Sequence, residues 1–162
     1  MSVLVLIEHD NKNIKSSSLN TITAAKKIDK SVHAVVLGEN CSNVAEQLSK
    51  CEDLEEILIS DDAIFKNHIA ENVSTVIVEL SKKYSHILAP SSTFGKNIMP
   101  RVAAKLDISQ VSDIIKIESE DTFIRPIYAG NALATVQSTD AIKIITIRPT
   151  SFDAAATSGG NA

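Results

Sequence analysis

The chain has 162 residues, of which 44% are hydrophobic and only 4% aromatic, and its net charge at neutral pH is −4. This length and apolar content suffice for one core built mainly from aliphatic side chains, so we expect a single domain. The acidic balance argues against nucleic-acid binding. No apolar run approaches the roughly 20 residues of a membrane-spanning helix, so no membrane insertion is expected.

Short apolar runs alternate with helical patterns through the first two thirds of the chain. The runs cover residues 3–7, 32–37, 56–59 and 85–89. They are rich in β-branched residues and nearly continuous, which is typical of strands covered on both faces. Apolar stripes with helical spacing cover residues 19–28, 44–48, 69–80 and 98–106. Because a helix tolerates proline in its first turn, Pro100 is expected at the start of the last of these helices.

The last third of the chain has the pattern of β-structure. A strand is expected at residues 113–117, followed by a hairpin with arms at 122–128 and 132–138. The arms meet at Gly130-Asn131, a pair typical of two-residue turns that need positive φ. A third strand, residues 142–147, is expected to complete an antiparallel meander that extends the main sheet or lies beside it.

Strand–helix alternation followed by a meander predicts an α/β fold. We expect a Rossmann-like, three-layer arrangement with a mainly parallel sheet of about five strands and a C-terminal antiparallel β-meander. Residues 1–150 are expected to form the domain. Residues 151–162 consist largely of Ala, Ser, Thr and Gly, which bury little surface, so they are expected to be a linker toward a further domain.

Ligands of open α/β sheets bind at the carboxyl ends of the strands, so polar residues there are the first candidates. Glu8-His9-Asp10 offers a carboxylate beside a histidine, which suits an acid–base pair, although a polar loop is the simpler interpretation. Ser91-Ser92-Thr93, followed by Gly95-Lys96, suits an anion at a helix start, and ordinary capping by a hydroxyl is the alternative. Two further candidate loops are Gly38-Glu39-Asn40 and Ser60-Asp61-Asp62.

The common cofactor and catalytic motifs are missing. The five glycines form neither a dinucleotide fingerprint nor a phosphate loop, and the four histidines lack metal-ligand spacing. Cys41 and Cys51 lie too far apart in sequence for a redox pair and are expected to be small core residues. Without a catalytic constellation, the chain is not expected to be an enzyme.

Three polar residues of the hairpin suggest a contact surface. Arg125 lies within a strand, Tyr128 at its end and Asn131 in the turn. Tyr and Arg are favoured anchors of protein interfaces, so these three residues are candidates for a partner interface. The alternative is that Arg125 is merely an exposed strand residue and that Asn131 only satisfies the turn.

Several strings together resemble the electron transfer flavoprotein alpha subunit. They are LNTITAAKKI (residues 19–28), FGKNIMPRVAAKLD (94–107), SDI (112–114), TFIRPIYAGNALATV (122–136) and TSFDAAATSGG (150–160). The resemblance runs in order from residue 3 to the end. It implies a Rossmann-like amino-terminal domain related to the adenine nucleotide alpha hydrolases.

The resemblance also implies a function. Members of this family pair an alpha with a beta subunit, and the heterodimer carries electrons through FAD. The electrons come from dehydrogenases, such as the acyl-CoA dehydrogenases of fatty acid oxidation, and pass to a quinone oxidoreductase at the membrane. FAD is held mainly by the family's carboxyl-terminal domain and a structural AMP by the beta subunit. No cofactor-binding residue is therefore expected in this chain, whose role would be to dock the beta subunit and support the flavin domain.

Two matters stay open at this point. Residues 1–8 lack the pattern of a signal peptide, so a bacterial cytoplasm is expected, with the mitochondrial matrix as the alternative for a processed chain. The alternative function is that of an autonomous nucleotide-binding module or hydrolase related to the universal stress proteins. Such a module would use the strand ends at residues 8–10 and 90–96.

Overall fold

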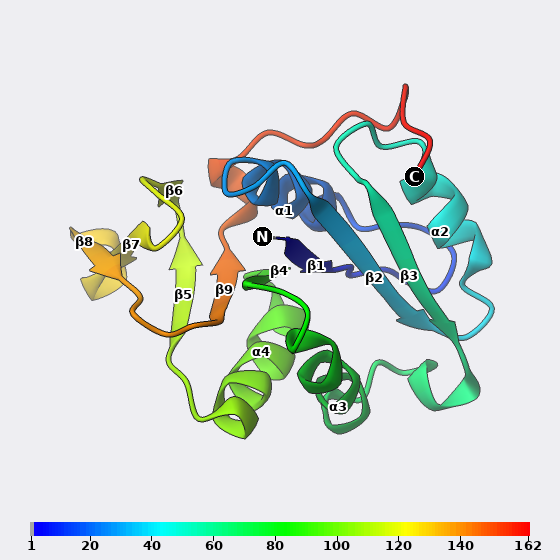
Figure 1. Ribbon diagram of the computed structural model, residues 1–162, viewed down its shortest axis with the longest axis horizontal. Helices are drawn as coiled ribbons and strands as arrows, with labels where there is room; N and C mark the ends of the chain where they lie inside the picture. Colours follow the sequence, from blue (N-terminus) through cyan, green and yellow to red (C-terminus); the bar gives the residue numbers. More distant parts are fainter. Residues whose placement is uncertain (1) are drawn as a thin grey trace.

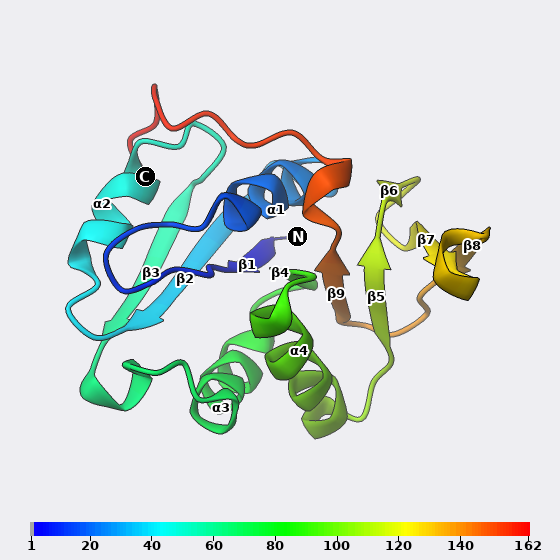
Figure 2. The ribbon, with the colours of Figure 1, turned by 180° about the vertical axis from the view of Figure 1, so that it is seen from behind.

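The computed structural model describes residues 2–162 and arranges them in three layers around a six-stranded parallel sheet (Figures 1 and 2). The strand order is β3-β2-β1-β4-β9-β5. These strands are β1 (Val3–Leu6), β2 (Val32–Gly38), β3 (Glu56–Asp61), β4 (His86–Pro90), β5 (Gln110–Ile114) and β9 (Lys143–Ile147). A small antiparallel sheet contains β6 (Lys116–Ile117), β7 (Thr122–Ile127) and β8 (Ala132–Gln137).

Four α-helices cover the two faces of the parallel sheet. They are α1 (Ser16–Lys26), α2 (Ser42–Ser49), α3 (Ala70–Ser81) and α4 (Thr93–Leu106). Ile22 of α1 and Leu48 of α2 belong to the core on one face, and Ile77 of α3 and Met99 of α4 to the core on the other. All four residues of β1 are buried, because side chains of successive strand residues enter opposite cores. The expected α/β fold is thus confirmed, with six parallel strands in place of about five.

The strand expected at residues 113–117 is two strands. β5 ends at Ile114 and β6 begins at Lys116 in the other sheet. Asp113 has a φ of 58°, and the pairing of β5 with β9 shifts register between Val111 and Ile114. The irregular backbone therefore redirects the chain from one sheet to the other at this point.

The third strand of the expected meander lies elsewhere. β9 is inserted between β4 and β5 in the parallel sheet, so the antiparallel meander consists of β6, β7 and β8 alone. The reason is burial. Ile144, Ile145 and Ile147 are all fully buried, and the continuous apolar run suits a strand covered on both faces better than an exposed hairpin strand.

The expected two-residue turn at Gly130-Asn131 is wrong. Ile127 pairs with Ala132, so four residues, 128–131, connect β7 and β8. Positive φ values occur at Tyr128 (49°), its successor Ala129 (54°) and Gly130 (92°), whereas Asn131 has a φ of −71°. The left-handed backbone therefore begins two residues earlier than the glycine suggested.

Pro100 is not in the first turn of its helix. α4 begins at Thr93, so Pro100 lies well inside it. Its missing N–H leaves the Lys96 carbonyl without the usual helical partner. Pro100 is exposed, so this carbonyl lies on the side of the helix where water can satisfy it.

The last ten residues lie along α1 and α2. The side-chain amide of Asn20 donates to the carbonyl of Phe152 at 2.6 Å, and the Ala155 amide donates to the carbonyl of Leu19 at 3.1 Å. Further along, the Gly160 amide donates to the carbonyl of Lys50 at 2.9 Å. Residues 153–162 therefore follow a defined path over the domain. Whether this segment leads to a further domain stays a prediction.

Candidate functional site

The crevice between the carboxyl ends of β1 and β4 is where an open sheet of this order binds ligands. Glu8 fills it. Its Oε2 accepts the hydroxyls of Ser92 at 2.7 Å and Ser17 at 3.1 Å. Ser17 lies in the first turn of α1, and Ser92 caps α4 by accepting the Gly95 amide. The amino ends of helices stabilise negative charge, so the Glu8 carboxylate occupies the position in which a bound phosphate would also be stabilised.

Beside Glu8, a pair of histidines is packed into the same edge of the sheet. His9 is 4% exposed, and its ring lies edge-on to that of His68 with 4.6 Å between centroids. His9 Nδ1 accepts the amide of Asn11 at 3.0 Å. The pKa of His9 is lowered from 6.5 to about 4, mainly by burial and secondly by the nearby His68. The imidazole is therefore neutral at physiological pH.

Asn11 joins the loops that follow the first three strands. Its side chain accepts the Glu39 amide at 3.1 Å and donates to the Lys66 carbonyl at 3.0 Å. A side chain at Gly38 would place its Cβ 2.5 Å from Asn11 Oδ1 and 2.7 Å from the His9 ring, so glycine is needed there. These contacts hold the loops in one rigid arrangement.

The remaining strand ends are also bonded within the domain. Asp61 accepts the amides of Asn40 at 2.7 Å and Cys41 at 3.1 Å. Asp113 forms a bidentate ion pair with Arg148. Burial raises the pKa of Asp113, but the hydrogen bonds and the charge of Arg148 outweigh this effect and lower it overall.

This geometry decides between the interpretations of the strand ends. His9 uses Nδ1 on the backbone, and the Glu8 carboxylate is bonded to two serines, so the two side chains do not form an acid–base pair. Ser92 acts as a helix cap, which confirms that interpretation. Cys41 and Cys51 are free and buried, as expected of small core residues. Within residues 2–162, no group of three or more His, Cys, Asp or Glu side chains could hold a metal ion.

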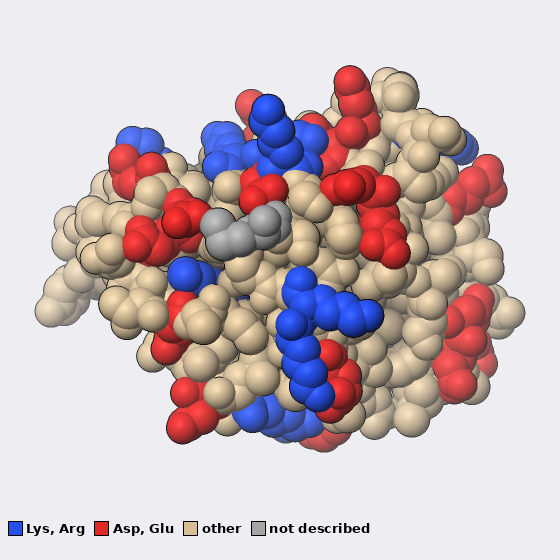
Figure 3. Space-filling view, viewed as in Figure 1, with Lys and Arg blue, Asp and Glu red and all other residues tan. Residues whose placement is uncertain are grey.

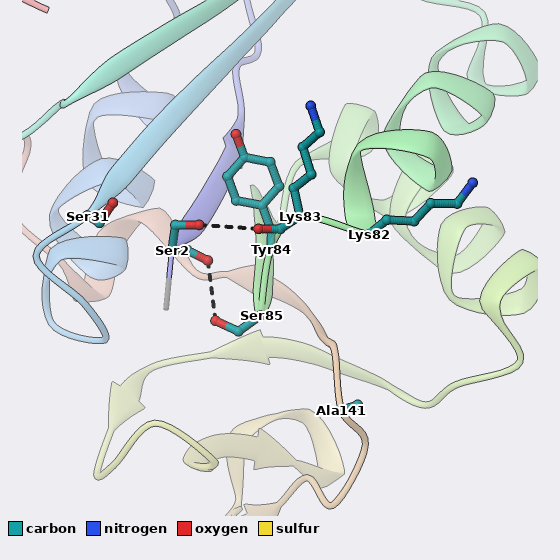
Figure 4. A pocket seen from close by; sticks show the side chains of 7 residues that line it. All are labelled: Ser2, Ser31, Lys82, Lys83, Tyr84, Ser85 and Ala141. Atoms are coloured by element: carbon teal, nitrogen blue, oxygen red, sulfur yellow. Dashed lines mark hydrogen bonds between the residues drawn. The ribbon is translucent and has the colours of Figure 1, made fainter.

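The charge distribution on one face and a hollow at the amino ends of the strands also bear on small-molecule binding. Figure 3 shows acidic and basic side chains interspersed on one face, without a basic stripe. A wide hollow of about 580 Å³ opens at the amino ends of the strands (Figure 4). The amines of Lys82 and Lys83 point apart there, and the Tyr84 hydroxyl is bonded to His33 at 2.9 Å. Binding sites place polar groups that converge on the ligand, which these do not.

The meander carries the three residues proposed from sequence as a partner interface. Tyr128 is 79% exposed at the tip, and Asn131 is exposed beside it. Arg125 pairs with Ala134 within the hairpin, and its Nε is buried without a hydrogen-bond partner among the described residues. The exposed Leu133 adds an apolar side chain to the same hairpin. The structure thus brings the three residues into one projecting element.

The meander is fastened to the domain at its base. Phe123 is fully buried in the core that contains Ile22 and Leu48. His86 at the start of β4 is 1% exposed, and its Nε2 lies 2.6 Å from the Glu120 carbonyl in the loop between β6 and β7. A rigid base suits a surface that presents its tip to another molecule.

Sequence reasoning missed two residues of the strand-end cluster. His68 lies in a loop far from His9 in sequence, and only the parallel arrangement of β1 and β3 brings their ends together. Ser17 was overlooked among three consecutive serines at the start of α1. A hydroxyl in the first turn of a helix beside an acidic strand end was the available signal for Ser17.

Comparison with known proteins gives a consistent result. The family model described as "Electron transfer flavoprotein domain" matches residues 3–162. The chain is 51% identical over 162 residues to the electron transfer flavoprotein subunit alpha of Pseudomonas aeruginosa, covering 100% of this chain and 52% of that protein. It is 46% identical to the mitochondrial alpha subunit of Dictyostelium discoideum, covering 98% of this chain and 47% of that protein. The chain therefore spans about half the length of the curated relatives it matches.

Proposed function

This chain belongs to the electron transfer flavoprotein family, and we propose that it serves there as the amino-terminal scaffold domain of an alpha subunit. In this role it docks a beta subunit and supports a flavin domain. The whole heterodimer carries electrons from dehydrogenases, such as acyl-CoA dehydrogenases, through FAD to a quinone oxidoreductase. Relatives occur in bacteria and mitochondria, so we place the protein in a bacterial cytoplasm, with the mitochondrial matrix as the alternative.

The observation that carries this proposal is the projecting meander. Its edge strand β8 has no charged residue, and no strand among residues 2–162 pairs with its far side, because β8 ends the order β6-β7-β8. Tyr128 and Leu133 are 79% and 63% exposed at its tip. Exposed aromatic and aliphatic side chains beside a free strand edge are costly in water and favourable in an interface. We assign Arg125, Tyr128 and Asn131 to that interface.

The family implies FAD, and the residues of this chain do not fit it. The place for a dinucleotide pyrophosphate in this fold is the crevice at the β1 and β4 ends, where a glycine-rich loop would donate backbone amides. Here the Glu8 carboxylate occupies that place and would repel a phosphate. We therefore propose that FAD is bound mainly by a part of the subunit outside this chain. The same carboxylate counts against the alternative, a nucleotide-binding module or hydrolase.

None of the helices among residues 2–162 has both the length and the apolar character to cross a bilayer.

Association with the beta subunit tests the proposal. Arg125→Ala, Tyr128→Ala and Asn131→Ala are placed separately in a full-length alpha subunit that carries this domain. Truncating a well-packed Tyr or Arg anchor typically costs on the order of 2 kcal/mol of binding free energy. We therefore expect Arg125→Ala and Tyr128→Ala each to weaken association by about thirtyfold. Glu46→Ala, at an exposed position on α2, is the control and leaves the affinity unchanged.

Circular-dichroism melts separate lost docking from lost folding. Tyr128 is almost fully exposed, so its truncation leaves the melting temperature of the domain close to that of the parent. If folded Arg125→Ala and Tyr128→Ala variants bind the beta subunit as the parent does, the meander is structural only and the assignment fails.

A further inference from the structure

Within the part of the chain that the structure describes, the opposite end of the molecule also presents a strand edge without a pairing strand. β3 ends the parallel sheet, at the far side from β5 and the meander (Figure 1). The Gly38 carbonyl of β2 accepts the amide of Asp62 at 2.9 Å, and Leu37 pairs with Ser60 in the register. Alternate strand residues direct their backbone groups to opposite sides, so even-numbered residues of β3 face β2. Ile57 and Ile59 therefore direct their N–H and C=O groups to the free edge.

An apolar groove runs beside this edge. It lies between β3 and α3, has a volume of about 180 Å³ and is lined mainly by Val35, Leu37, Leu58, Val76 and Leu80. This set of residues is called the β3 groove below. Small-molecule sites usually measure about 300–1,000 Å³, so the β3 groove better suits a few apolar side chains of a bound peptide. Ile59 is 46% exposed at its rim.

The edge strand is flanked by negative charge. Residues 52–62 contain six acidic side chains and no Lys, Arg or His. Glu55 and Glu56 have exposed side-chain fractions of 63% and 55%, and Asp61 and Asp62 follow at the other end of β3. Asp53 lies 3.7 Å from the amine of Lys26, and the ring nitrogens of His33 lie 3.8 Å and 3.2 Å from the carboxylates of Glu55 and Glu56. The surface around the β3 groove is therefore complementary to a basic segment rather than to an acidic one.

We propose that the β3 edge and the β3 groove form a docking site for an extended segment of a partner protein in which apolar side chains alternate with Lys or Arg. The segment adds a strand to β3 through the backbone groups of Ile57 and Ile59. Its apolar side chains enter the β3 groove, and its cations face Glu55 and Glu56. Strand addition beside a groove between an edge strand and a helix is an established mode of peptide recognition.

The acidic residues have a competing explanation. Charged side chains on an edge strand also prevent unwanted pairing with other chains. The two explanations differ in what a basic partner does: protective charges exclude every strand, whereas a docking site binds a basic strand and rejects an acidic one.

Fluorescence anisotropy with the 162-residue chain distinguishes these explanations. The probe is a labelled seven-residue peptide that alternates lysine and valine, and the matched control replaces each lysine with glutamate. We expect saturable binding of the lysine peptide and at least a tenfold weaker signal from the glutamate peptide. The Glu55→Lys/Glu56→Lys double variant should weaken binding of the lysine peptide roughly tenfold, because exposed ion pairs are individually weak.

Backbone pairing is tested on both partners. Ile59→Pro removes an outward N–H and leaves the bonds to β2 intact, whereas Ile59→Ala removes the same side chain and keeps the N–H. We expect at least a tenfold loss for Ile59→Pro relative to Ile59→Ala. A lysine–valine peptide methylated on its valine nitrogens should bind at least tenfold more weakly to the unaltered chain, which avoids reliance on the proline variant folding.

Two results would overturn the proposal. Absence of lysine-peptide binding would show that the acids only protect the edge. Binding that depends on salt but is insensitive both to methylation of the peptide and to Ile59→Pro would show unspecific charge attraction without strand addition.

Discussion

The buried histidine at the carboxyl edge of the sheet makes the domain sensitive to acid. His9 is 4% exposed and faces His68. Burial and this neighbour lower its pKa from 6.5 to about 4 in the folded chain. As the pH falls, the unfolded chain therefore binds a proton at this position before the folded chain does.

The sign and size of the effect follow from linkage. A histidine with a lowered folded pKa leaves stability unaffected above pH 6.5 and reduces it between pH 6.5 and about 4. Each pH unit in this window costs about 1.4 kcal/mol, so His9 alone removes roughly 3 kcal/mol by pH 4. Burial also lowers the pKa values of His68 and His86, so the whole domain loses more than this.

Urea denaturation of the parent and of His9→Asn at pH values from 7.5 to 4.5 measures this contribution. The asparagine Oδ1 replaces Nδ1 as the acceptor of the Asn11 amide, but the lost ring contacts lower the stability at pH 7.5 by about 1–2 kcal/mol. Between pH 7.5 and 4.5 the variant should then lose roughly 2.5 kcal/mol less than the parent, so that the two stabilities converge or cross. Equal losses in both proteins would refute the assignment of His9 as a neutral, buried group.

Three further outcomes are expected. The 162-residue chain should bind neither FAD nor AMP, because Glu8 fills the phosphate position; a yellow protein whose flavin absorption survives desalting would contradict this. Gly95→Ala should destabilise the domain by about 3 kcal/mol or more in a thermal melt, because its Cβ would lie 1.9 Å from the Pro90 carbonyl oxygen. Gly130→Ala, which meets no atom within 4 Å but has a φ of 92°, is the control and should cost only about 1 kcal/mol. Asp113→Asn should lower the free energy of unfolding by about 1 kcal/mol at pH 7, because it weakens the ion pair with Arg148. Since the pKa of Asp113 is lowered in the folded chain, the difference between variant and parent should shrink as the pH falls through that pKa. A constant difference down to pH 2 would argue against the ion pair.

Continuous apolar runs predicted the interior strands well because burial on both faces leaves a simple signal. Residues 3–7, 32–37 and 85–89 became β1, β2 and β4. The same signal was present in the run that contains Ile144, Ile145 and Ile147, but its place after a hairpin favoured the meander. Neighbours in sequence are often neighbours in a sheet, and here tertiary burial overrode that tendency.

The site was less predictable than the fold because its contacts join distant segments. The strand-end loops were identified from the alternation of elements, but the bond between Glu8 and Ser92 depends on β1 and β4 being adjacent. The backbone at the hairpin tip was also hidden. Tyr128 and Ala129 adopt positive φ without being glycine or asparagine, which residue preferences do not predict.

The position of β9 has a consequence for how the chain reaches its folded state. Among strands β1 to β9, β9 leaves the ribosome last, yet it separates β4 from β5, so β5 has no neighbour in the main sheet until residue 147 has been made. During synthesis, β5 and the meander therefore expose apolar surface to solvent until β9 pairs with β5. This surface includes the side chain of Phe123, which is buried in the core of the folded domain. Such non-local pairing slows folding and exposes unfinished edges to aggregation. A chain cut before residue 143 would keep β1 to β4 but lose the strand that pairs β5 with the main sheet.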